Sequence, residues 1–585
     1  MLKNFRWMLG ALMVVCAFCL TSLTSCVEEV QKVGVTSHTG ADPKGLNPYI
    51  VSDATARKIC ERIFQPLLNI DYQSYDLIPI LAKTLPKVEK TADGSTMDFE
   101  IRDEAVWDNG EPITGYDVAF SLKALKVPKV DSRALRPYFE YIVDVVVNEE
   151  NPKKFTMVCD KPYMLQVSSL TDLLIYPSYV YDAEGVLENF SVRQLSEGGA
   201  ELEENLELIK FAESFNSPKF QREIVVGSGP YRFDTWQTNQ RVVLALKEDW
   251  YGHDVPNANS WLQAYPKTLT YETINDPTTA VTALRGEKID VMSRITPRVF
   301  VEDLKKSESF SEKFNPSTPI QFLYSYIGLN MRNPKLSDVK TRQALTHLMD
   351  VQAVTDNIFY GMAEPVSTFV HPSRKKFINE NIPYTEFNIE KAKTLLAEAG
   401  WEDKNADGVV EKDIEGEDTP FELNFIYPSA AEQTTGKAVL MFKEAAKKAG
   451  ITINPIGLEF AKFLDLLKKH DFEMYYGIWV SSPYESDPTQ IWHTKSQEGG
   501  SNYVSFGDAK SDQLIDELKR ELDEEKRIAK YKELQQMIYE QAPYIFLNST
   551  KNRVALHKRF IDAKSSGMNP GYFLPSLMEM EAVEQ

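Results

Sequence analysis

The sequence predicts an α/β protein built from mixed sheets with flanking helices. Helix-like and strand-like segments alternate along the whole chain, which is the pattern expected when helices cover the faces of sheets. Over residues 436–450 an apolar face at helical spacing ends in Gly450, and a strand-like stretch at 451–454 follows directly. Such a step from helix to strand is typical of an open α/β sheet. The 585 residues contain no internal repeat and are 43% apolar, which is enough for several cores.

Further helices are predicted from apolar spacing and from signals at their ends. We expect helices over residues 116–126 and 388–400, the second capped by Asn388 and ended by Gly400. Residues 512–541 combine many charges with apolar residues at helical spacing, which predicts two surface helices. The acidic stretch 197–207 predicts a helical insertion or a loop.

The first 25 residues have the features of an export signal. Lys3 and Arg6 precede an apolar run over residues 7–20, about 14 residues, which is shorter than a membrane-spanning helix. No second apolar stretch approaches transmembrane length. We therefore expect residues 1–25 to be a signal peptide and the rest of the chain to act outside the cytoplasm.

The end of this signal suggests a lipid anchor. Leu23-Thr24-Ser25-Cys26 resembles the lipobox of bacterial lipoproteins, in which the signal is cut before the cysteine and that cysteine is lipidated. The resemblance implies a lipidated Cys26, a tether over residues 26–32 and a location at the cell envelope, on the periplasmic or extracellular face of a membrane. Each buried CH₂ of the acyl chains would contribute about 0.8 kcal/mol to membrane binding. The alternative is an ordinary signal peptide with an incidental cysteine.

Charge and cysteine content narrow the class of protein. The net charge of −20 excludes a nucleic-acid-binding surface as the main function and disfavours anionic lipid headgroups. With Cys26 and the signal segment set aside, Cys60 and Cys159 remain. We predict that they are separate buried thiols; a disulfide between them is the alternative in an oxidising compartment.

Short motifs occur in a fixed order over nearly the whole mature chain. They are LNP at 46–48, IFQPLL at 63–68, WDNGEPIT at 107–114, GSGPYRF at 227–233, LRGEKIDV at 284–291, DVKTRQAL at 338–345, EKAK at 390–393 and LLAEAGW at 395–401. The third motif predicts a tight turn at Asn109-Gly110 before a helix capped by Thr114. Together the motifs resemble the family 5 extracellular solute-binding proteins, which include oligopeptide-, dipeptide- and nickel-binding members.

The resemblance implies a two-lobed, hinged fold of the periplasmic-binding-protein type with an extra third domain. The implied divisions are 33–72, 224–316 and 555–585 for the core of the first lobe, 73–223 for its extra domain, and 317–554 for the second lobe. We place the two hinge strands near residues 317–326 and 548–554. A ligand would shift an existing open–closed equilibrium by making better contacts in the closed form.

The function implied by the resemblance is that of the substrate-binding component of an ABC importer. We expect a monomer that captures short peptides or similar small solutes and delivers them to permease subunits. A nickel chelate, haem or an oligosaccharide are alternative ligands on the same fold, and a sensor or chaperone role would share it. No cofactor is implied.

An enzyme is the alternative from a different class, in the form of a secreted hydrolase. The sequence contains no His-Glu-x-x-His, Gly-x-Ser-x-Gly or phosphate-loop pattern, and its seven histidines are scattered singly. We therefore predict that the chain is not an enzyme.

The segment after the strand-like residues 473–479 is the predicted ligand site. In oligopeptide binders the matching loop carries an acid followed by tyrosine, which pairs with the amino terminus of the ligand. Here a proline precedes the tyrosine, and the acids come after it. The predicted ligand-binding residues are Asp487 and then Glu485 as partners of a ligand ammonium, with Tyr484, Trp479 and Trp492 as apolar walls. Alternatively, Asp487 only starts a turn and the aromatic residues belong to the core.

A second loop resembles the start of a calcium-binding loop. Asp403, Asn405 and Asp407 supply oxygens at positions 1, 3 and 5, and Gly408 stands at position 6. Position 12 is Ile414 in place of a bidentate glutamate. We predict no metal site, and structural calcium stays an open alternative.

Overall fold

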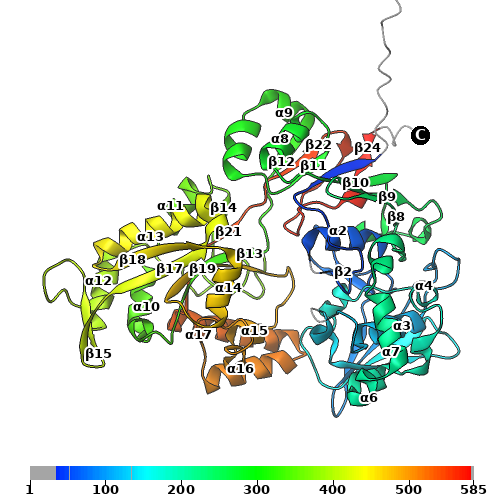
Figure 1. Cartoon of the computed structure of the whole chain (residues 1–585), viewed down its shortest axis with the longest axis horizontal. Coiled ribbons are helices and arrows are strands. Elements are labelled where there is room, and N and C mark those ends of the chain that lie inside the picture. Colours follow the sequence, from blue (N-terminus) through cyan, green and yellow to red (C-terminus); the bar gives the residue numbers. More distant parts are fainter. Residues whose placement is uncertain (1–33, 52, 133–134, 581–585) are drawn as a thin grey trace, which may run out of the picture.

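The computed structural model describes residues 34–51, 53–132 and 135–580. Two lobes lie side by side in Figure 1, with most of the first half of the chain on the right and the yellow and orange segments on the left. This arrangement confirms the predicted two-lobed α/β fold with mixed sheets. The signal segment and Cys26 lie outside the described residues.

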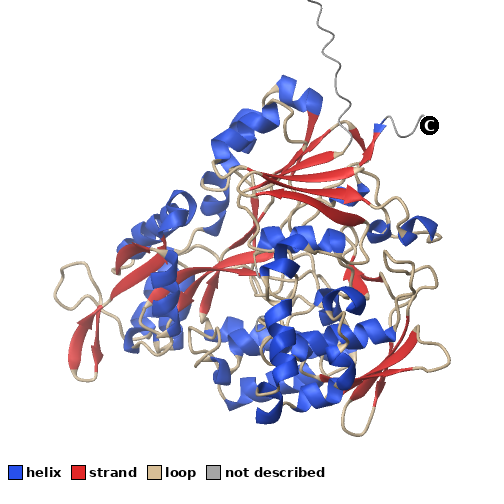
Figure 2. Cartoon of the chain, turned by 45° about the vertical axis from the view of Figure 1, so that its right-hand side comes forward, coloured by secondary structure: helices blue, strands red, loops and turns tan. Residues whose placement is uncertain are grey.

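A seven-stranded mixed sheet forms the upper part of the first lobe (Figure 2). Its order is β12 (Phe314–Ser317), β22 (Val554–His557), β11 (Val291–Met292), β1 (Val35–Thr39), β10 (Thr268–Thr273), β9 (Arg241–Leu246) and β8 (Tyr231–Gln237). Strand β1 runs parallel to β10 and β11, and the other pairs are antiparallel. Helices α8 (Pro277–Arg285) and α9 (Glu308–Lys313) share an apolar cluster with β11 and β12. The sheet thus joins segments from both ends of the described chain.

A four-stranded antiparallel sheet lies below it in the same lobe. Its order is β4 (Lys87–Lys90), β5 (Ser95–Glu100), β7 (Lys154–Cys159) and β6 (Ile142–Val147). Around it lie β2 (Leu68–Ile70), β3 (Leu77–Pro79), α3 (Gly115–Lys126), α4 (Ser178–Tyr181), α5 (Val192–Glu197), α6 (Ala200–Glu203) and α7 (Leu206–Phe215). One continuous apolar cluster connects these elements with α2 (Ala54–Ile63) and the large sheet. The two larger sheets of the first lobe therefore share one apolar cluster, and a separate, smaller cluster lies between α8, α9, β11 and β12.

A five-stranded sheet with helices on both faces forms the second lobe. Its order is β18 (Thr452–Leu458), β17 (Glu422–Pro428), β19 (Met474–Val480), β13 (Leu323–Leu329) and β20 (Tyr544–Phe546), with β17 parallel to β18 and β19. Helices α10 (Val339–Thr346), α11 (Val351–Asn357), α12 (Ile389–Glu398) and α13 (Lys437–Lys448) pack on one face. Helices α14 (Phe460–Lys468), α15 (Thr489–Trp492), α16 (Ala509–Arg520) and α17 (Glu524–Gln541) pack on the other. Short pairs add β14 (Ala363–Pro365) with β21 (Asn548–Thr550), β15 (Glu411–Ile414) with β16 (Glu417–Pro420), and β23 (Phe560–Ile561) with β24 (Met578–Glu579).

The predicted helix ends agree with the structure. Thr114 caps α3, and Asp117 completes a capping box by accepting a hydrogen bond from the Thr114 backbone N–H at 2.8 Å. The Asn388 side chain accepts from the Lys391 backbone N–H at the start of α12, and Gly400 follows its end with a φ of +87°. Strand β18 follows α13 as predicted, and the 512–541 segment forms the two helices α16 and α17. Cys60 and Cys159 are separate, buried thiols, as predicted.

The chain passes between the lobes through two short segments that lie side by side. Residues 318–322 connect β12 to β13, and residues 551–553 connect β21 to β22. The backbone N–H of Gln321 donates to the Thr550 carbonyl at 3.0 Å, and that of Asn552 donates to the Pro319 carbonyl at 2.7 Å. Two adjacent connections of this kind allow one lobe to rotate against the other about a single line. The domain boundaries proposed from the sequence remain predictions.

His371 packs against the first of these segments and makes the stability of the fold depend on pH. Its ring centroid lies 4.7 Å from that of Phe322, and its Nε2 lies 3.2 Å from the Ser549 Oγ. Burial lowers the pKa of His371 to about 4, so the unfolded chain binds a proton there at a higher pH than the folded chain does. The contribution of His371 to stability is therefore present above pH 6.5 and is lost as the pH falls towards 4.

We expect His371→Asn to weaken the dependence of the free energy of unfolding on pH below pH 7. Asparagine retains an acceptor for the Ser373 backbone N–H, which now bonds to the His371 Nδ1 at 3.2 Å. Between pH 7 and pH 4.5 the free energy of unfolding should fall by about 2 kcal/mol less in the variant than in the wild type. Denaturant unfolding at the two pH values measures this difference. Equal losses in the two proteins would mean that His371 is protonated in the fold.

Candidate ligand-binding site

The carboxyl end of β19 is a half-paired strand beside the first crossing segment. Its pairs with β17 stop at Tyr475, while its pairs with β13 continue to Val480 opposite Leu323. Ile478 and Val480 on this stretch are 55% and 81% exposed. The following Ser481 backbone N–H bonds to the Phe322 carbonyl at 2.9 Å. An extended ligand backbone can add to such a strand while its side chains meet the exposed apolar residues.

Both acids of the predicted site already have cationic partners within the chain. Glu485 is buried, and its Oε1 accepts from the Nε of Arg527 on α17 at 2.6 Å. The Asp487 Oδ2 lies 3.3 Å from the Lys519 Nζ on α16, and its Oδ1 accepts from the Thr489 backbone N–H. In this conformation Glu485 is part of an internal ion pair. The assignment of Asp487 and Glu485 to a ligand ammonium stays a prediction.

The three aromatic residues of the predicted site lie in different surroundings. Trp492 is 0% exposed, and its ring contacts those of Phe506 and Tyr544. It lies in the core of the second lobe and has no surface for a ligand in this conformation, because the strands and helices on both sides enclose it. Trp479 is half-buried and donates through Nε1 to the Tyr544 hydroxyl at 3.3 Å. Of the three aromatic residues, Trp479 and Tyr484 are half-buried and have exposed surface, whereas Trp492 has none.

The lobes also touch at a point far from the crossing segments in the sequence. The backbone N–H of Met164 in the first lobe donates to the Lys519 carbonyl of α16 at 2.8 Å. The Lys519 Nζ lies over the Tyr163 ring, 5.5 Å from its centroid. Burial raises the pKa of Tyr163, and the Asp487 carboxylate raises it further. Figure 1 shows α16 next to the first lobe at this point, so the predicted ligand loop lies at a contact between lobes.

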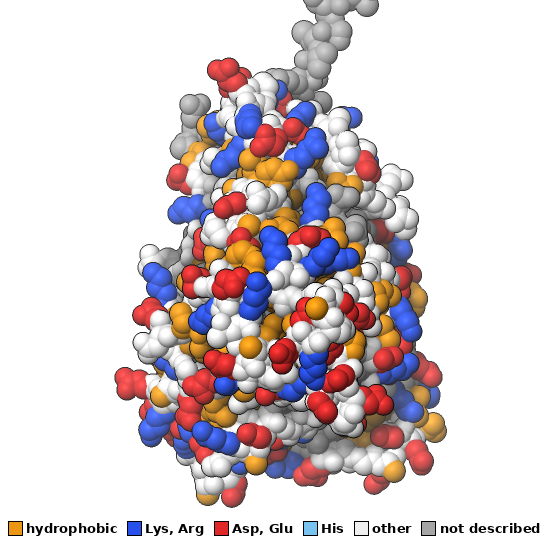
Figure 3. All heavy atoms as spheres, turned by 90° about the vertical axis from the view of Figure 1, so that its left-hand side faces the viewer, with side chains coloured by type: hydrophobic (Ala, Val, Ile, Leu, Met, Phe, Trp, Pro, Cys, Tyr) orange, Lys and Arg blue, Asp and Glu red, His pale blue; other side chains and the backbone are white. Residues whose placement is uncertain are grey.

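Sequence reasoning missed the residues that complete this region. Tyr163, Lys519 and Arg527 carry no local pattern that distinguishes them from other surface positions. The run Arg374-Lys375-Lys376 is a local pattern of positive charge that the sequence does show, since three successive cations are unusual in a chain of net charge −20. Elsewhere the charges are mixed: Figure 3 shows basic and acidic side chains interspersed over one face of the molecule.

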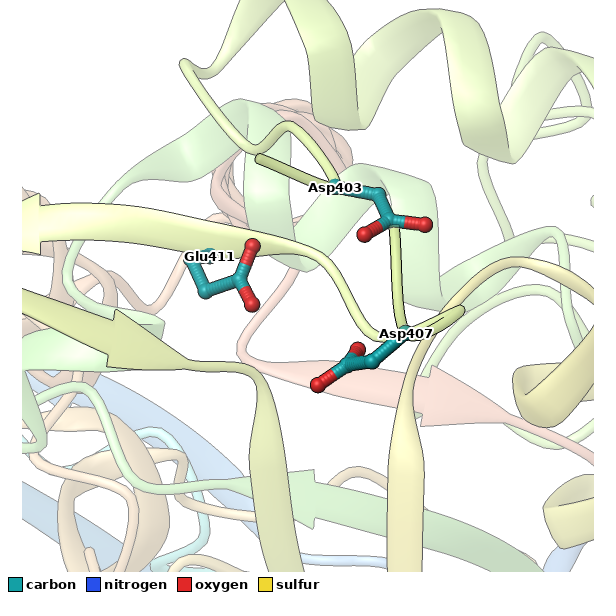
Figure 4. A group of neighbouring side chains, drawn as sticks. All are labelled: Asp403, Asp407 and Glu411. Carbon is teal, nitrogen blue, oxygen red and sulfur yellow. The ribbon is translucent and has the colours of Figure 1, made fainter. Parts of the chain in front are cut away.

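The loop that resembles a calcium site brings three carboxylates together. Oxygens of Asp403, Asp407 and Glu411 all lie within 4.8 Å of one another (Figure 4). Loop donors already use all three groups. The Gly408 backbone N–H bonds to Asp403, the Val409 backbone N–H to Asp407, and the Lys404 backbone N–H to Glu411, while the Asn405 Nδ2 bonds to both Asp407 and Glu411. These bonds stabilise the turn without an ion. Glu411 stands at position 9 of the loop when Asp403 is position 1.

This architecture is that of the two-lobed solute-binding proteins. It consists of two α/β lobes, two adjacent crossing segments and a half-paired strand end between the lobes. The model of the family "Bacterial extracellular solute-binding proteins, family 5 Middle" matches residues 76–502. The chain belongs to this family, as the motifs indicated.

Relatives and solved structures agree with this assignment. The chain is 28% identical over 341 residues to the oligopeptide-binding protein AppA of Bacillus subtilis, a match that spans 58% of this chain and 59% of that relative. It is 21% identical over 535 residues to the periplasmic oligopeptide-binding protein OppA of Escherichia coli, spanning 87% and 85% of the two chains. The structure of AppA with a nonapeptide superposes with a TM-score of 0.67 at 22% identity, covering 93% of this chain and 98% of that one. That of NikZ from Campylobacter jejuni with Ni(L-His) gives 0.68 at 22% identity, covering 91% and 96%.

These relatives are binding proteins, and the family is extracellular by its description. Among the described residues no helix is both long enough and apolar enough to cross a membrane.

Proposed function

We propose that this chain is the substrate-binding component of an ABC importer, which captures peptides between its lobes and passes them to a permease. The observation that carries the proposal is the half-paired end of β19 beside the first crossing segment. Backbone pairing there holds an extended peptide without reading its side chains. Rotation about the two crossing segments then encloses the peptide, and no bond is made or broken.

A peptide ligand fits the structure better than a nickel chelate or haem. The similar proteins include haem-binding protein A of Haemophilus influenzae, and NikZ, whose solved structure contains Ni(L-His). His493 is the histidine that follows the predicted ligand loop most closely in the sequence, and it is the one that such a ligand would be expected to use. Its side chain is buried, and its Nδ1 lies 3.1 Å from the Asp512 carboxylate. It is therefore engaged within the second lobe.

A lipid anchor on Cys26 completes the proposal. The lipobox-like segment and the apolar run before it support it, together with the extracellular character of the family. The anchor keeps the monomer at the membrane surface beside its permease. Comparing the membrane-bound fraction of wild type and Cys26→Ser in the native host tests this part.

We expect the natively purified protein to carry a mixture of short peptides. Mass spectrometry of the released ligand should show a series of peptide masses, and X-ray scattering should show a smaller radius of gyration with ligand than after stripping. A metal complex or a sugar as the released ligand would refute the peptide assignment. A scattering curve that does not respond to any added solute would refute closure itself.

A further inference from the structure

A cavity of about 360 Å³ lies on the first lobe, where three of the family motifs meet. Among its lining residues, Ile63 begins the motif IFQPLL, Asp108 belongs to WDNGEPIT and Gly227 begins GSGPYRF. Strand β8 supplies part of the wall, and Figure 1 shows β8 on the side of the first lobe that is turned away from the second. Cavities of roughly 300–1,000 Å³ are typical of small-molecule sites. The cavity is therefore a candidate site for one small solute, separate from the site predicted between the lobes.

A largely buried ion pair forms one part of the cavity wall. The Lys247 Nζ, just after β9, donates to the Asp108 Oδ1 and to the Gly227 carbonyl, both at 2.6 Å. The Lys247 side chain is 11% exposed. Burial lowers the pKa of this ammonium, and the Asp108 carboxylate opposes the shift. The charges of Lys247 and Asp108 thus neutralise each other and hold the motifs together.

Two further charged side chains line the cavity without being neutralised in this way. Glu223 is exposed, and its carboxylate forms no hydrogen bond or ion pair with any residue that the structure describes. Arg232 on β8 is 59% exposed, and its guanidinium lies 3.9 Å from the Asp234 carboxylate, which is beyond the length of a hydrogen bond. One carboxylate and one guanidinium are therefore available to a ligand at the same cavity.

The rest of the lining determines which ligand suits these two groups. Ile224 and Phe233 are half-buried apolar residues, and each follows one of the two free charges in the sequence. The charged residues of the lining are two acids and two bases, so their charges sum to zero. A ligand with a net charge would leave one group unbalanced, which is unfavourable away from bulk water. A small molecule with one ammonium, one carboxylate and an apolar group matches the whole lining.

We propose that this cavity binds a free amino acid with an apolar side chain, as a second solute site that is independent of peptide capture between the lobes. The Arg232 guanidinium binds the α-carboxylate through parallel N–H bonds, and the Glu223 carboxylate accepts from the α-ammonium. The side chain of the amino acid lies against Ile224 and Phe233. A longer peptide does not fit in the same way, because its two terminal charges are farther apart than those of one amino acid.

Equilibrium dialysis of L-leucine against the natively purified full-length protein tests the site while the native ligand stays between the lobes. N-acetyl-leucine lacks the ammonium, and leucinamide lacks the carboxylate. We expect leucine to bind about 10- to 100-fold more tightly than either derivative, because each derivative loses one charge-assisted bond.

Two substitutions assign the two charges one at a time. Glu223→Gln should weaken leucine binding about 10-fold or more and leave the binding of N-acetyl-leucine unchanged, because that derivative has no ammonium. Arg232→Gln should weaken leucine binding in the same way and leave that of leucinamide unchanged. Equal weakening of all three compounds would assign the residue to the fold of the cavity and overturn its role as a ligand contact. Neither variant should change the set of peptides that the protein carries.

Arg222→Gln is the matched control, because it removes the same charge as Arg232→Gln close by in the sequence. The Arg222 guanidinium stacks on the Trp236 ring, 4.0 Å from its centroid, and does not line the cavity, so leucine should bind as tightly as to the wild type. Equal binding of leucine and its two derivatives, or no saturable leucine binding, would overturn the inference and leave peptide capture intact. Leucine that added peptides displace would lie between the lobes, which would also overturn it.

Discussion

Glu485→Gln is expected to lower the free energy of unfolding by about 3–5 kcal/mol. The Glu485 and Arg527 side chains are 2% and 10% exposed, and they are joined at 2.6 Å. Removing the carboxylate charge leaves the Arg527 guanidinium buried without its counter-ion. Denaturant unfolding followed by circular dichroism at pH 7 measures the effect.

Two further variants show whether the buried ion pair is the cause. Asp487→Asn breaks the more exposed pair with Lys519 and should cost only about 0.5–1 kcal/mol. The double variant Glu485→Gln/Arg527→Met should recover most of the loss, because no unpaired charge remains at that pair. If Glu485→Gln were as stable as the wild type but failed to retain peptides, Glu485 would instead be the partner of a ligand ammonium, as the sequence suggested.

Trp492→Ala is expected to lower the free energy of unfolding by about 3–5 kcal/mol and to leave the set of bound peptides unchanged. The indole is 0% exposed, and it contacts the rings of Phe369, Phe506 and Tyr544. Alanine leaves a cavity in the core of the second lobe that its helices and sheet fill only in part. Trp492→Phe should cost about 1–2 kcal/mol, since the buried indole N–H forms no hydrogen bond that would be lost.

Trp479→Ala is the matched comparison from the same loop. Its side chain is half-buried beside Tyr326, with the ring centroids 6.4 Å apart, so the stability loss should be smaller than for Trp492. If Trp479 walls the site, peptide retention falls while the fold persists. Altered ligand masses from folded Trp492→Ala at low temperature would show that the tryptophan reaches the ligand after all.

The elements that the sequence predicted well are those whose signals are local. Thr114 and Asp117 are three residues apart, and their capping box follows from the backbone of one helical turn. Asn388 and Gly400 mark the ends of α12 for the same reason. The order of the family motifs was equally readable, because each motif is a short stretch of the chain.

The site was less predictable because its bonds join residues that are distant in sequence. Glu485 and Arg527 are 42 residues apart, and whether a loop acid is free or paired depends on where α17 packs. Trp479 and Trp492 look alike as aromatic residues near a loop, yet only packing decides that one is half-buried and the other is core. The contact of Met164 with Lys519 joins the two lobes, which no local pattern reports.

The sequence by itself determined the α/β class, the family, the helix ends and the motifs that place the chain among two-lobed solute-binding proteins. Local hydrogen bonding and apolar periodicity act over a few residues, so they can be read from the chain directly. Only the tertiary structure decided which charges are neutralised, since ion pairs and burial depend on segments that meet in space. The structure pairs Glu485 with Arg527 and Asp487 with Lys519, segments that are far apart along the chain.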